Sequence, residues 1–354
     1  MQVKKVVINN FRNIDHKELV CDGSTTVMCA KNMSGKTNTL NAIHWAFTGS
    51  DLEGSVDNRA NYPINKPEVS EISVRVETDT FSFERKAIME DGTPTVHLFV
   101  DDVECATIKK GDALIVQKLG LTDIVLSSPK DFNIIKFLLN PLYFDTLAPK
   151  TLRKFLYQFA QINFDEICEK QVKAVKELLS DYTNKDPYYL AETLDKDKKA
   201  IKKTIDGCKT AKTLFPVISE DADKVIKEQT TLLTKVDVNI ALVDKYALSV
   251  SKSVNDFYKT AMGIAICLLE KGVGEDVYKD VCYPVLPTSN LPFHLGSYAE
   301  KTYIGVLFIN EFCLRFNVRP LTLLIDNMES LDNNTTKFLN NLGVNYIGAF
   351  VKGE

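Results

Sequence analysis

The chain has 354 residues, of which 45% are hydrophobic and 25% charged, and its formal net charge is −4. These values are typical of a folded protein with two domains or one large one, and they exclude a low-complexity or strongly basic chain. Any contact with nucleic acid therefore needs a local basic patch.

Targeting and metal-binding signals are weak along the whole sequence. The N-terminus lacks the apolar run of a signal peptide, and no stretch has the length of a membrane span. The eight cysteines include no Cys-x-x-Cys pair, which argues against a zinc hook and favours a reduced, cytoplasmic setting. The four histidines are too widely separated to argue for a metal site or a catalytic triad.

Residues 30–37 read Ala-Lys-Asn-Met-Ser-Gly-Lys-Thr. A β-branched, apolar run at 25–29 predicts a buried strand before them, and apolar residues at helical spacing over 40–47 predict a helix after them. This is the setting of a phosphate-binding loop, whose backbone N–H groups point at phosphate oxygens. In such a loop Lys36 reaches the β- and γ-phosphates, and the Thr37 hydroxyl contacts Mg²⁺.

Two positions depart from the glycine-rich form of this loop. Ala30 stands where glycine is usual, and Met33 stands where a second glycine is frequent. The backbone at these positions is therefore expected to do without positive φ. A plain turn is the alternative interpretation, and the flanking strand and helix argue against it.

The rest of the first 150 residues is rich in strand signals. Near-alternating apolar patterns at 69–76 and 81–85 predict strands, and 95–100 with 103–107 predicts a hairpin. We expect a half-exposed antiparallel sheet.

Residues 151–282 change to lysine-rich helical patterns. Two series spaced by seven residues, from Ile226 to Leu268 and from Gln229 to Ile264, are apolar at every position except Gln229. They predict a coiled-coil seam over six heptads, and an amphipathic helix on a globular core is the alternative.

The predicted partner of this seam is the earlier helical stretch, which has four apolar residues on one face: Leu190, Leu194, Ile201 and Ile205. Pro187 is expected to interrupt that stretch, and residues 214–216 are expected to mark the reversal of the chain.

Seven lysines crowd the sequence before the predicted reversal: Lys196, Lys198, Lys199, Lys202, Lys203, Lys209 and Lys212. Two acids, Asp197 and Asp206, fall within the same span. A solvated helix face and a contact with the DNA backbone are both compatible with this pattern.

Residues 283–354 return to an α/β pattern. A buried strand is predicted at 321–325 and a second at 344–351, with a helix at 333–342 between them. Asp326 ends the first of these strands and can organise the metal of a phosphate site through a Mg²⁺-bound water.

These features together resemble the SMC/RecF/SbcC class of ABC-type ATPase heads, and in particular phage-encoded SbcC-like ATPases with a short arm. The resemblance spans the whole chain and is carried by four segments: 8–14, 30–37 with Asn32 included, 140–144 followed by 153–156, and 326–330. It implies an α/β P-loop ATPase head with a mixed sheet, an antiparallel β lobe and an inserted antiparallel coiled-coil arm. Residues 1–150 and 283–354 would form the two halves of the head, and 151–282 the arm.

The resemblance implies ATP and Mg²⁺ as ligands. Thr37 and Asp326 are assigned to the metal, and the ATP contacts to Arg12, Ala30, Lys31, Asn32, Met33, Ser34, Gly35, Lys36, Thr37 and Asn38. It also implies an ATP-dependent homodimer, in which Ser297 opens a signature helix that faces the nucleotide of the partner subunit. Tyr298 and Ala299 replace the two glycines usual there, so a plain N-capped helix is the alternative interpretation.

Further departures from the family pattern concern catalysis. Asn327 stands where the family has a water-activating Glu, and Glu329 is the alternative carboxylate. A general base typically contributes about 10²–10⁴-fold, so slow hydrolysis is expected. Asn140 is assigned to the place of the metal- and water-sensing Gln, and the usual switch His is missing from residues 346–350.

The favoured hypothesis is an ATP-binding, slowly hydrolysing head that acts in DNA recombination, repair or replication. Its expected partners are a second copy of the chain, DNA along the arm lysines and a partner nuclease, with no membrane. The second hypothesis is a non-hydrolysing scaffold that uses ATP to recruit DNA-processing partners. A P-loop kinase is the third, and it has no use for a heptad rod.

Overall fold

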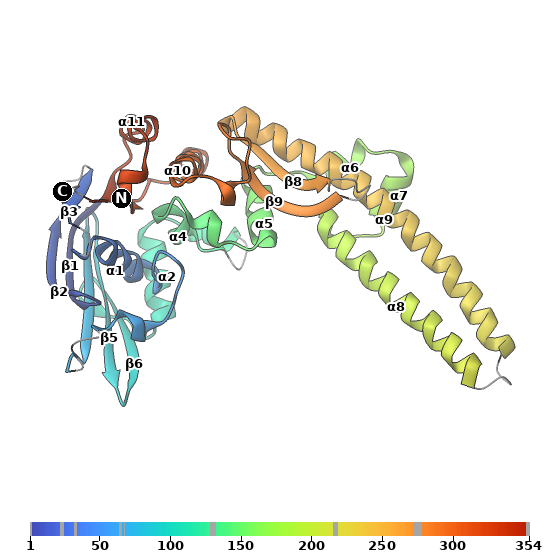
Figure 1. The fold of residues 1–354 in the computed structure, drawn as a ribbon, viewed down its shortest axis with the longest axis horizontal. Coiled ribbons are helices and arrows are strands. Elements are labelled where there is room, and N and C mark those ends of the chain that lie inside the picture. The colour runs from blue at the N-terminus through green and yellow to red at the C-terminus, as the bar shows by residue number, and fades with distance from the viewer. Residues whose placement is uncertain are drawn as a thin grey trace. The chain divides into compact units, whose positions relative to one another are not determined.

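The computed structural model describes residues 2–21, 25–31, 34–63, 66, 68–127, 132–214, 219–271 and 278–351. The chain divides into two compact units (Figure 1). The first comprises Met1–Phe155, Ala261–Ile264 and Tyr283–Glu354, and the second comprises Leu156–Thr260 and Ala265–Cys282. The functional domains assigned from the sequence stay a prediction. Among the described residues, no helix combines the length and the apolar character needed to cross a membrane.

The largest sheet of the first unit has six strands in the order β2-β1-β4-β5-β6-β7, and each neighbouring pair is antiparallel. Alternate residues such as Val74, Val76 and Phe83 are fully buried, which confirms the predicted half-exposed sheet. The predicted hairpin also forms, but its second strand ends at Glu104 and not at residue 107. The strands are β1 (Val3–Phe11), β2 (Ile14–Val20), β4 (Glu71–Thr78), β5 (Ser82–Glu90), β6 (Thr93–Val100) and β7 (Val103–Glu104).

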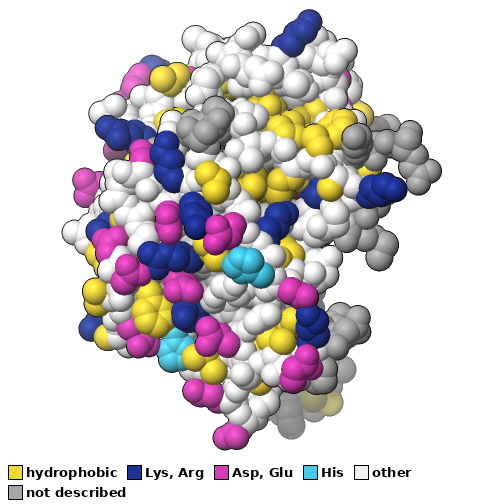
Figure 2. Space-filling model, turned by 90° about the vertical axis from the view of Figure 1, so that its left-hand side faces the viewer, with side chains coloured by type: hydrophobic (Ala, Val, Ile, Leu, Met, Phe, Trp, Pro, Cys, Tyr) yellow, Lys and Arg dark blue, Asp and Glu magenta, His cyan; other side chains and the backbone are white. Residues whose placement is uncertain are grey.

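The exposed surface of this sheet carries charges of both signs. Cross-strand ion pairs join Lys5 to Glu18 at 3.0 Å and Lys86 to Glu71 at 3.5 Å. On the side of the molecule shown in Figure 2, lysine and arginine side chains are likewise interspersed with acidic ones. A mixed surface of this kind produces little long-range attraction for a polyanion.

A parallel sheet places the phosphate loop in the first unit. Its order is β10-β11-β3, with β10 at Leu323–Ile325, β11 at Tyr346–Val351 and β3 at Thr26–Ala30. Helix α1 (Lys36–Thr48) follows β3 after the loop, as predicted, and every residue from 39 to 47 is buried. Because parallel strands end at the same edge of a sheet, the residues after β3 and β10 are brought together.

Helices complete the first unit. Phe137 packs against Phe144, Phe155 and Phe312 with ring centroids 5.1–5.5 Å apart. The helices are α2 (Ile108–Lys118), α3 (Thr122–Ser127), α4 (Ile134–Leu139), α10 (Tyr298–Arg315) and α11 (Asn333–Asn341), with 3₁₀ turns η1 (Asn58–Asn61), η2 (Tyr143–Thr146), η4 (Phe293–Leu295) and η5 (Met328–Ser330).

The second unit contains the predicted arm, a pair of long helices that lie side by side (Figure 1). These are α8 (Pro187–Leu214) and α9 (Ser219–Met262). Lys198 pairs with Asp237 at 2.7 Å and Lys212 with Asp223 at 2.6 Å, so residue numbers rise along one helix as they fall along the other. The helices are therefore antiparallel, which confirms the predicted fold class.

Shorter elements complete the chain around the arm. Helix α5 (Pro149–Phe159) continues from the first unit into the second, where α6 (Phe164–Glu169) and α7 (Lys173–Ser180) follow. A two-stranded sheet joins β8 (Ala265–Lys271) to β9 (Tyr278–Val285). Tyr188 donates a 2.8 Å hydrogen bond to the carbonyl of Leu268 in β8.

The predicted seam was wrong at its C-terminal end. Helix α9 stops at Met262, Gly263 adopts φ 70°, and the last predicted seam residue, Leu268, lies in strand β8. Ile264, Ile266 and Leu268 are buried in alternation, which is a strand pattern. Ile264 and Leu268 are four residues apart, and this spacing places two side chains on the same face of a helix or of a strand.

The predicted interruption at Pro187 falls at a helix boundary, because residues 181–186 directly before it are not helical. Pro187 is the first residue of α8. Proline lacks a backbone N–H, and the first residue of a helix does not need one because that N–H has no intrahelical acceptor. The fixed φ of proline also suits a helix start. Residues 215 and 216 of the predicted reversal lie outside the described residues, between the end of α8 at Leu214 and the start of α9 at Ser219.

Candidate nucleotide-binding site

The structure brings Thr37 and Asp326 into contact. Thr37 is the second residue of α1 and Asp326 follows β10, and the hydroxyl of Thr37 donates to Asp326 Oδ1 at 3.2 Å. A hydroxyl and a carboxylate next to a phosphate loop form a suitable donor set for Mg²⁺, which takes oxygen ligands and keeps waters and phosphate oxygens as the others.

Lys36 lies inside the phosphate loop. Its ammonium donates to the carbonyl oxygens of Ala30 at 2.8 Å and Lys31 at 2.6 Å, and to the Ser34 hydroxyl at 3.3 Å. The residue is only 7% exposed, so a buried positive charge is held where a phosphate loop needs it. Asn32 and Met33, which the sequence also assigned to ATP, lie outside the described residues.

Gly35 adopts φ 82°, a left-handed conformation that favours glycine. A Cβ atom at this position would lie 3.3 Å from Asn13 Oδ1, so a side chain here would crowd the loop. The same Asn13 oxygen accepts a 2.7 Å hydrogen bond from Asn38. Asn13 was missed as a site residue, although it stands in segment 8–14, which carried part of the family resemblance.

A hollow of about 180 Å³ is lined by residues near the phosphate loop and by residues that follow β10. They include Asn13, Gly35, Lys36, Thr37, Asn38, Asp326, Asn327 and Glu329. A neighbouring hollow of about 560 Å³ shares Asn13 and Asn38 with it and adds Arg12, Tyr62 and Lys66. The first is suited to phosphates, and the second adjoins it.

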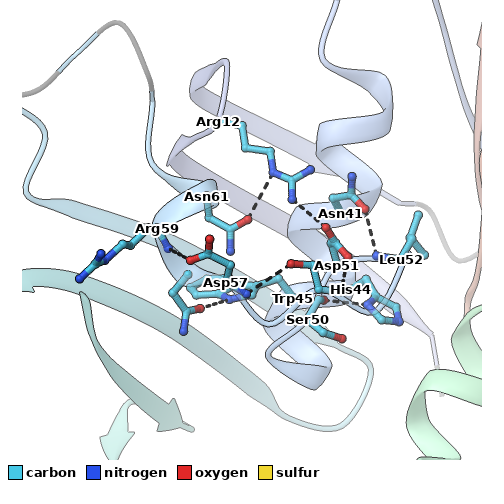
Figure 3. A network of polar contacts seen from close by, with 12 residues as sticks. Arg12, Asn41, His44, Trp45, Ser50, Asp51, Leu52, Asp57, Arg59 and Asn61 are labelled. Atoms are coloured by element: carbon cyan, nitrogen blue, oxygen red, sulfur yellow. Dashed lines mark hydrogen bonds and ion pairs between the residues drawn. The ribbon is translucent and has the colours of Figure 1, made fainter. Parts of the chain in front are cut away.

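Arg12 contacts the segment that follows α1 (Figure 3). Its guanidinium pairs with Asp51 at 3.0 Å and donates to Asn61 Oδ1 at 3.3 Å. Arg12 therefore lines the larger hollow while it braces this segment, and its predicted contact with the nucleotide stays a prediction.

The two residues assigned to water activation follow β10 in a turn. Asn327 adopts φ 47°, and η5 begins at the next residue, so the chain turns there and does not continue as a strand. Glu329 nevertheless lines the phosphate hollow. Its carboxylate accepts a 3.1 Å hydrogen bond from the backbone N–H of Val351, which fixes the side chain against β11.

Asn140 is 6% exposed, and both ends of its amide are engaged by backbone groups. It donates to the carbonyl of Leu52 at 3.1 Å and accepts from the N–H of Leu142 at 2.9 Å. These bonds give Asn140 a structural role between two segments of the chain, and its assignment as a water sensor stays a prediction.

Ser297 caps α10, as expected of the residue that opens this helix. It forms a capping box with Glu300, in which each side chain accepts from the other residue's backbone N–H. The hydroxyl of the next residue, Tyr298, donates to the backbone carbonyl of Asp326, and burial raises the pKa of this phenol. The sequence identified Tyr298 only as a departure from glycine, so this contact within one chain was missed.

Lys17 is a second lysine near the loop that the sequence did not single out. Its ammonium donates to Thr39 at 2.9 Å in the first turn of α1. Burial and the nearby charge of Lys36 lower the pKa of Lys17. Lys17 therefore lies close enough to Lys36 for the two charges to repel each other.

A model of the AAA_23 family, described as an AAA domain, matches residues 5–241, more than half of the chain. The chain belongs to this family of AAA/ABC-type ATPases. The match includes the phosphate loop and ends within α9.

The chain is also similar, more distantly, to RecF proteins. The chain is 25% identical over 188 residues to the "DNA replication and repair protein RecF" of Lachnoclostridium phytofermentans, which covers 50% of this chain and 47% of that protein. It is 29% identical over 137 residues to the RecF protein of Agathobacter rectalis, covering 38% and 35%. The chain thus matches about half or less of the length of these curated relatives.

Two solved structures align with nearly the whole chain at low similarity. A RecF–ATP structure from the RecFOR pathway is 15% identical with a TM-score of 0.46, covering 99% of this chain and 93% of that one. The Smc head domain of Pyrococcus furiosus is 13% identical with a TM-score of 0.46, covering 99% and 90%. The finer resemblance to phage-encoded SbcC-like ATPases stays a prediction.

Proposed function

We propose that this chain is an ATP-binding head of the SMC/RecF type, which acts in DNA recombination, repair or replication by ATP-dependent dimerisation. The contact between Thr37 and Asp326 carries this proposal, because it joins the phosphate loop to the strand-end carboxylate across the parallel sheet. Family membership and the distant RecF relatives support it.

The ligands are assigned to residues of the first unit. The loop around Lys36 binds the triphosphate through backbone N–H groups and the lysine ammonium. Thr37 and Asp326 hold Mg²⁺, which when bound neutralises charge on the phosphates. The base and ribose occupy the larger adjoining hollow, which Arg12 and Tyr62 line.

Static light scattering with and without ATP·Mg²⁺ tests the dimerisation. We expect the wild-type mass to double with ATP·Mg²⁺ and the Lys36→Ala variant to stay monomeric. DNA is added to each protein after this comparison. A mass that is monomeric and indifferent to nucleotide contradicts the proposal. Ser297 would act across the dimer interface, so Ser297→Ala should weaken the dimer more than it weakens ATP binding to the monomer.

A non-hydrolysing scaffold is the second candidate function, and one observation favours it. Asn327 stands directly after Asp326, and an amide cannot accept a proton from water. In the scaffold, ATP stabilises a complex that recruits DNA-processing partners. Phosphate release that is substantial in the wild type and abolished in Lys36→Ala would rule the scaffold out.

DNA binding is assigned to the arm. Lys198, Lys199 and Lys212 pair with acids, which favours the solvated-face interpretation for these three. The other four of the seven are exposed and make no ion pair with a described residue: Lys196, Lys202, Lys203 and Lys209. They remain available for DNA phosphates. The partner nuclease and the cytoplasmic setting stay predictions.

A further inference from the structure

A further cavity adjoins the contact between Thr37 and Asp326, and both residues line it. Its volume is about 250 Å³, and it is lined by residues of the first unit only. It shares Thr37, Asp326 and Asn327 with the phosphate hollow. A water that attacks a phosphoryl group bound at Thr37 would have room here.

Three carboxylates line this cavity: Glu53, Asp145 and Asp326. Asp326 is engaged with Thr37, and Asp145 forms an ion pair with Lys301 at 2.8 Å. Glu53 makes no hydrogen bond or ion pair with any described residue. Glu329 is absent from the residues that line this cavity, so Glu53 is the carboxylate here that is free to take a proton.

The backbone on both sides of Glu53 is held in place. Residues 51–55 form a closed turn, in which Asp51 N–H donates to Ser55 O at 3.0 Å and Ser55 N–H donates to Asp51 Oδ1 at 2.8 Å. The preceding residue, Leu52, is clamped between two amides, because its N–H donates to Asn41 Oδ1 and its carbonyl accepts from Asn140, both at 3.1 Å.

The same turn is anchored to the rest of the first unit (Figure 3). Arg12 pairs with Asp51, and the ring N–H of His44 donates to the carbonyl of Ser50 at 2.8 Å. Figure 3 shows these side chains converging on the turn, Arg12 from the residue after β1 and His44 from α1. These contacts fix the backbone that carries Glu53, whose exposed side chain lines the cavity.

We propose that Glu53 is the catalytic base for ATP hydrolysis and takes the role that Asn327 cannot perform. This inference rests on the proposed function. Glu53 accepts one proton from a water molecule in the cavity while the water oxygen bonds to the γ-phosphorus. The bond from that phosphorus to the β,γ-bridging oxygen breaks, and its electron pair stays on ADP. The proton then passes to the solvent, which regenerates the carboxylate.

Three variants of the full chain test this assignment: Glu53→Gln, Glu53→Asp and Glu329→Gln, with Glu18→Gln as a control on the exposed strand β2. ATP affinity is measured by titration, hydrolysis by single turnover, and the lifetime of the ATP-dependent dimer by light scattering. We expect Glu53→Gln to bind ATP as the wild type does, to hydrolyse it about 10²–10⁴-fold more slowly, and to prolong the dimer. Glu53→Asp should recover part of the rate, and Glu18→Gln should match the wild type.

The other outcomes contradict either the assignment of Glu53 or the proposed function. A wild-type rate in Glu53→Gln, or a loss in Glu329→Gln alone, overturns the assignment of Glu53 and leaves the proposed function standing. A wild type that binds ATP without turnover also overturns it and favours the scaffold. A wild type that binds no ATP contradicts the proposed function itself.

Discussion

The Thr37 hydroxyl donates a 3.2 Å hydrogen bond to the Asp326 carboxylate, although 289 residues of chain separate them. The contact exists because β3 and β10 belong to one parallel sheet and end at the same edge. In a phosphate site, the same two oxygens are suited to hold one Mg²⁺ ion.

Asp326→Asn should therefore remove most of the Mg²⁺ dependence of ATP binding. An amide can still accept from Thr37, but it lacks the charge that attracts the metal. We expect ATP affinity in Mg²⁺ to fall by roughly 10–100-fold, the usual effect of removing one charged hydrogen-bonding group. Titrations with Mg²⁺ and with EDTA measure this, and the exposed-carboxylate control Asp102→Asn should behave as the wild type. An unchanged Mg²⁺ effect in Asp326→Asn would remove Asp326 from the metal site.

Two glycine substitutions should shift stability in opposite directions. A Cβ atom at Gly305 in α10 would lie 1.8 Å from the carbonyl oxygen of Pro141, so backbone must move. Gly305→Ala should lower the free energy of unfolding by about 1–3 kcal/mol or more. Gly207 in α8 has nothing within 4 Å, and Gly207→Ala should raise helix stability by up to about 1 kcal/mol. Thermal unfolding checks both, and equal effects would contradict the packing described here.

His44 should make the fold sensitive to acid. Burial lowers its pKa from 6.5 to about 4, and the residue is 1% exposed. As pH falls from 6.5 towards 4, the unfolded chain binds a proton at this histidine before the folded chain does. The contribution of neutral His44 to the free energy of unfolding is complete above pH 6.5. At pH 5 the free energy of unfolding is lower by about 2 kcal/mol.

The variant His44→Asn tests that prediction, because its amide can still donate to Ser50 but does not titrate. Urea unfolding at pH 7 and pH 5 should show a smaller difference for His44→Asn than for the wild type. His16→Asn, on the exposed strand β2, should keep the wild-type difference. If His44→Asn keeps it as well, another group is responsible.

The four arm lysines that form no ion pair with a described residue should determine the salt dependence of any DNA binding. Replacing four lysines by alanine should make the negative slope of log affinity against log salt shallower: Lys196, Lys202, Lys203 and Lys209. The change should be up to about 0.9 for each DNA phosphate that is no longer neutralised. The matched control replaces four exposed lysines of α9 and changes the net charge equally: Lys224, Lys227, Lys235 and Lys245. Equal slopes for the two variants would favour the solvated-face interpretation.

Local patterns predicted the phosphate loop, the strand before Asp326 and the antiparallel lobe, because each depends on residues that are adjacent in the chain. The end of the coiled-coil seam was mispredicted because Ile264 and Leu268 fit both periods, and only the positive φ of Gly263 separates helix from strand. The contact of Tyr298 with Asp326 and the place of Glu53 could not be predicted. Both depend on how a helix start and a turn pack against a distant strand end.

Calorimetric titration of the wild-type chain and of Lys36→Ala with ATP·Mg²⁺ tests the central claim most directly. The account predicts saturable binding of one ATP per chain in the wild type. Lys36→Ala should bind at least about 10-fold more weakly, because the triphosphate then lacks its buried ammonium partner. No heat of binding in a folded wild type, or equal affinity in the two proteins, would contradict a nucleotide site at this loop.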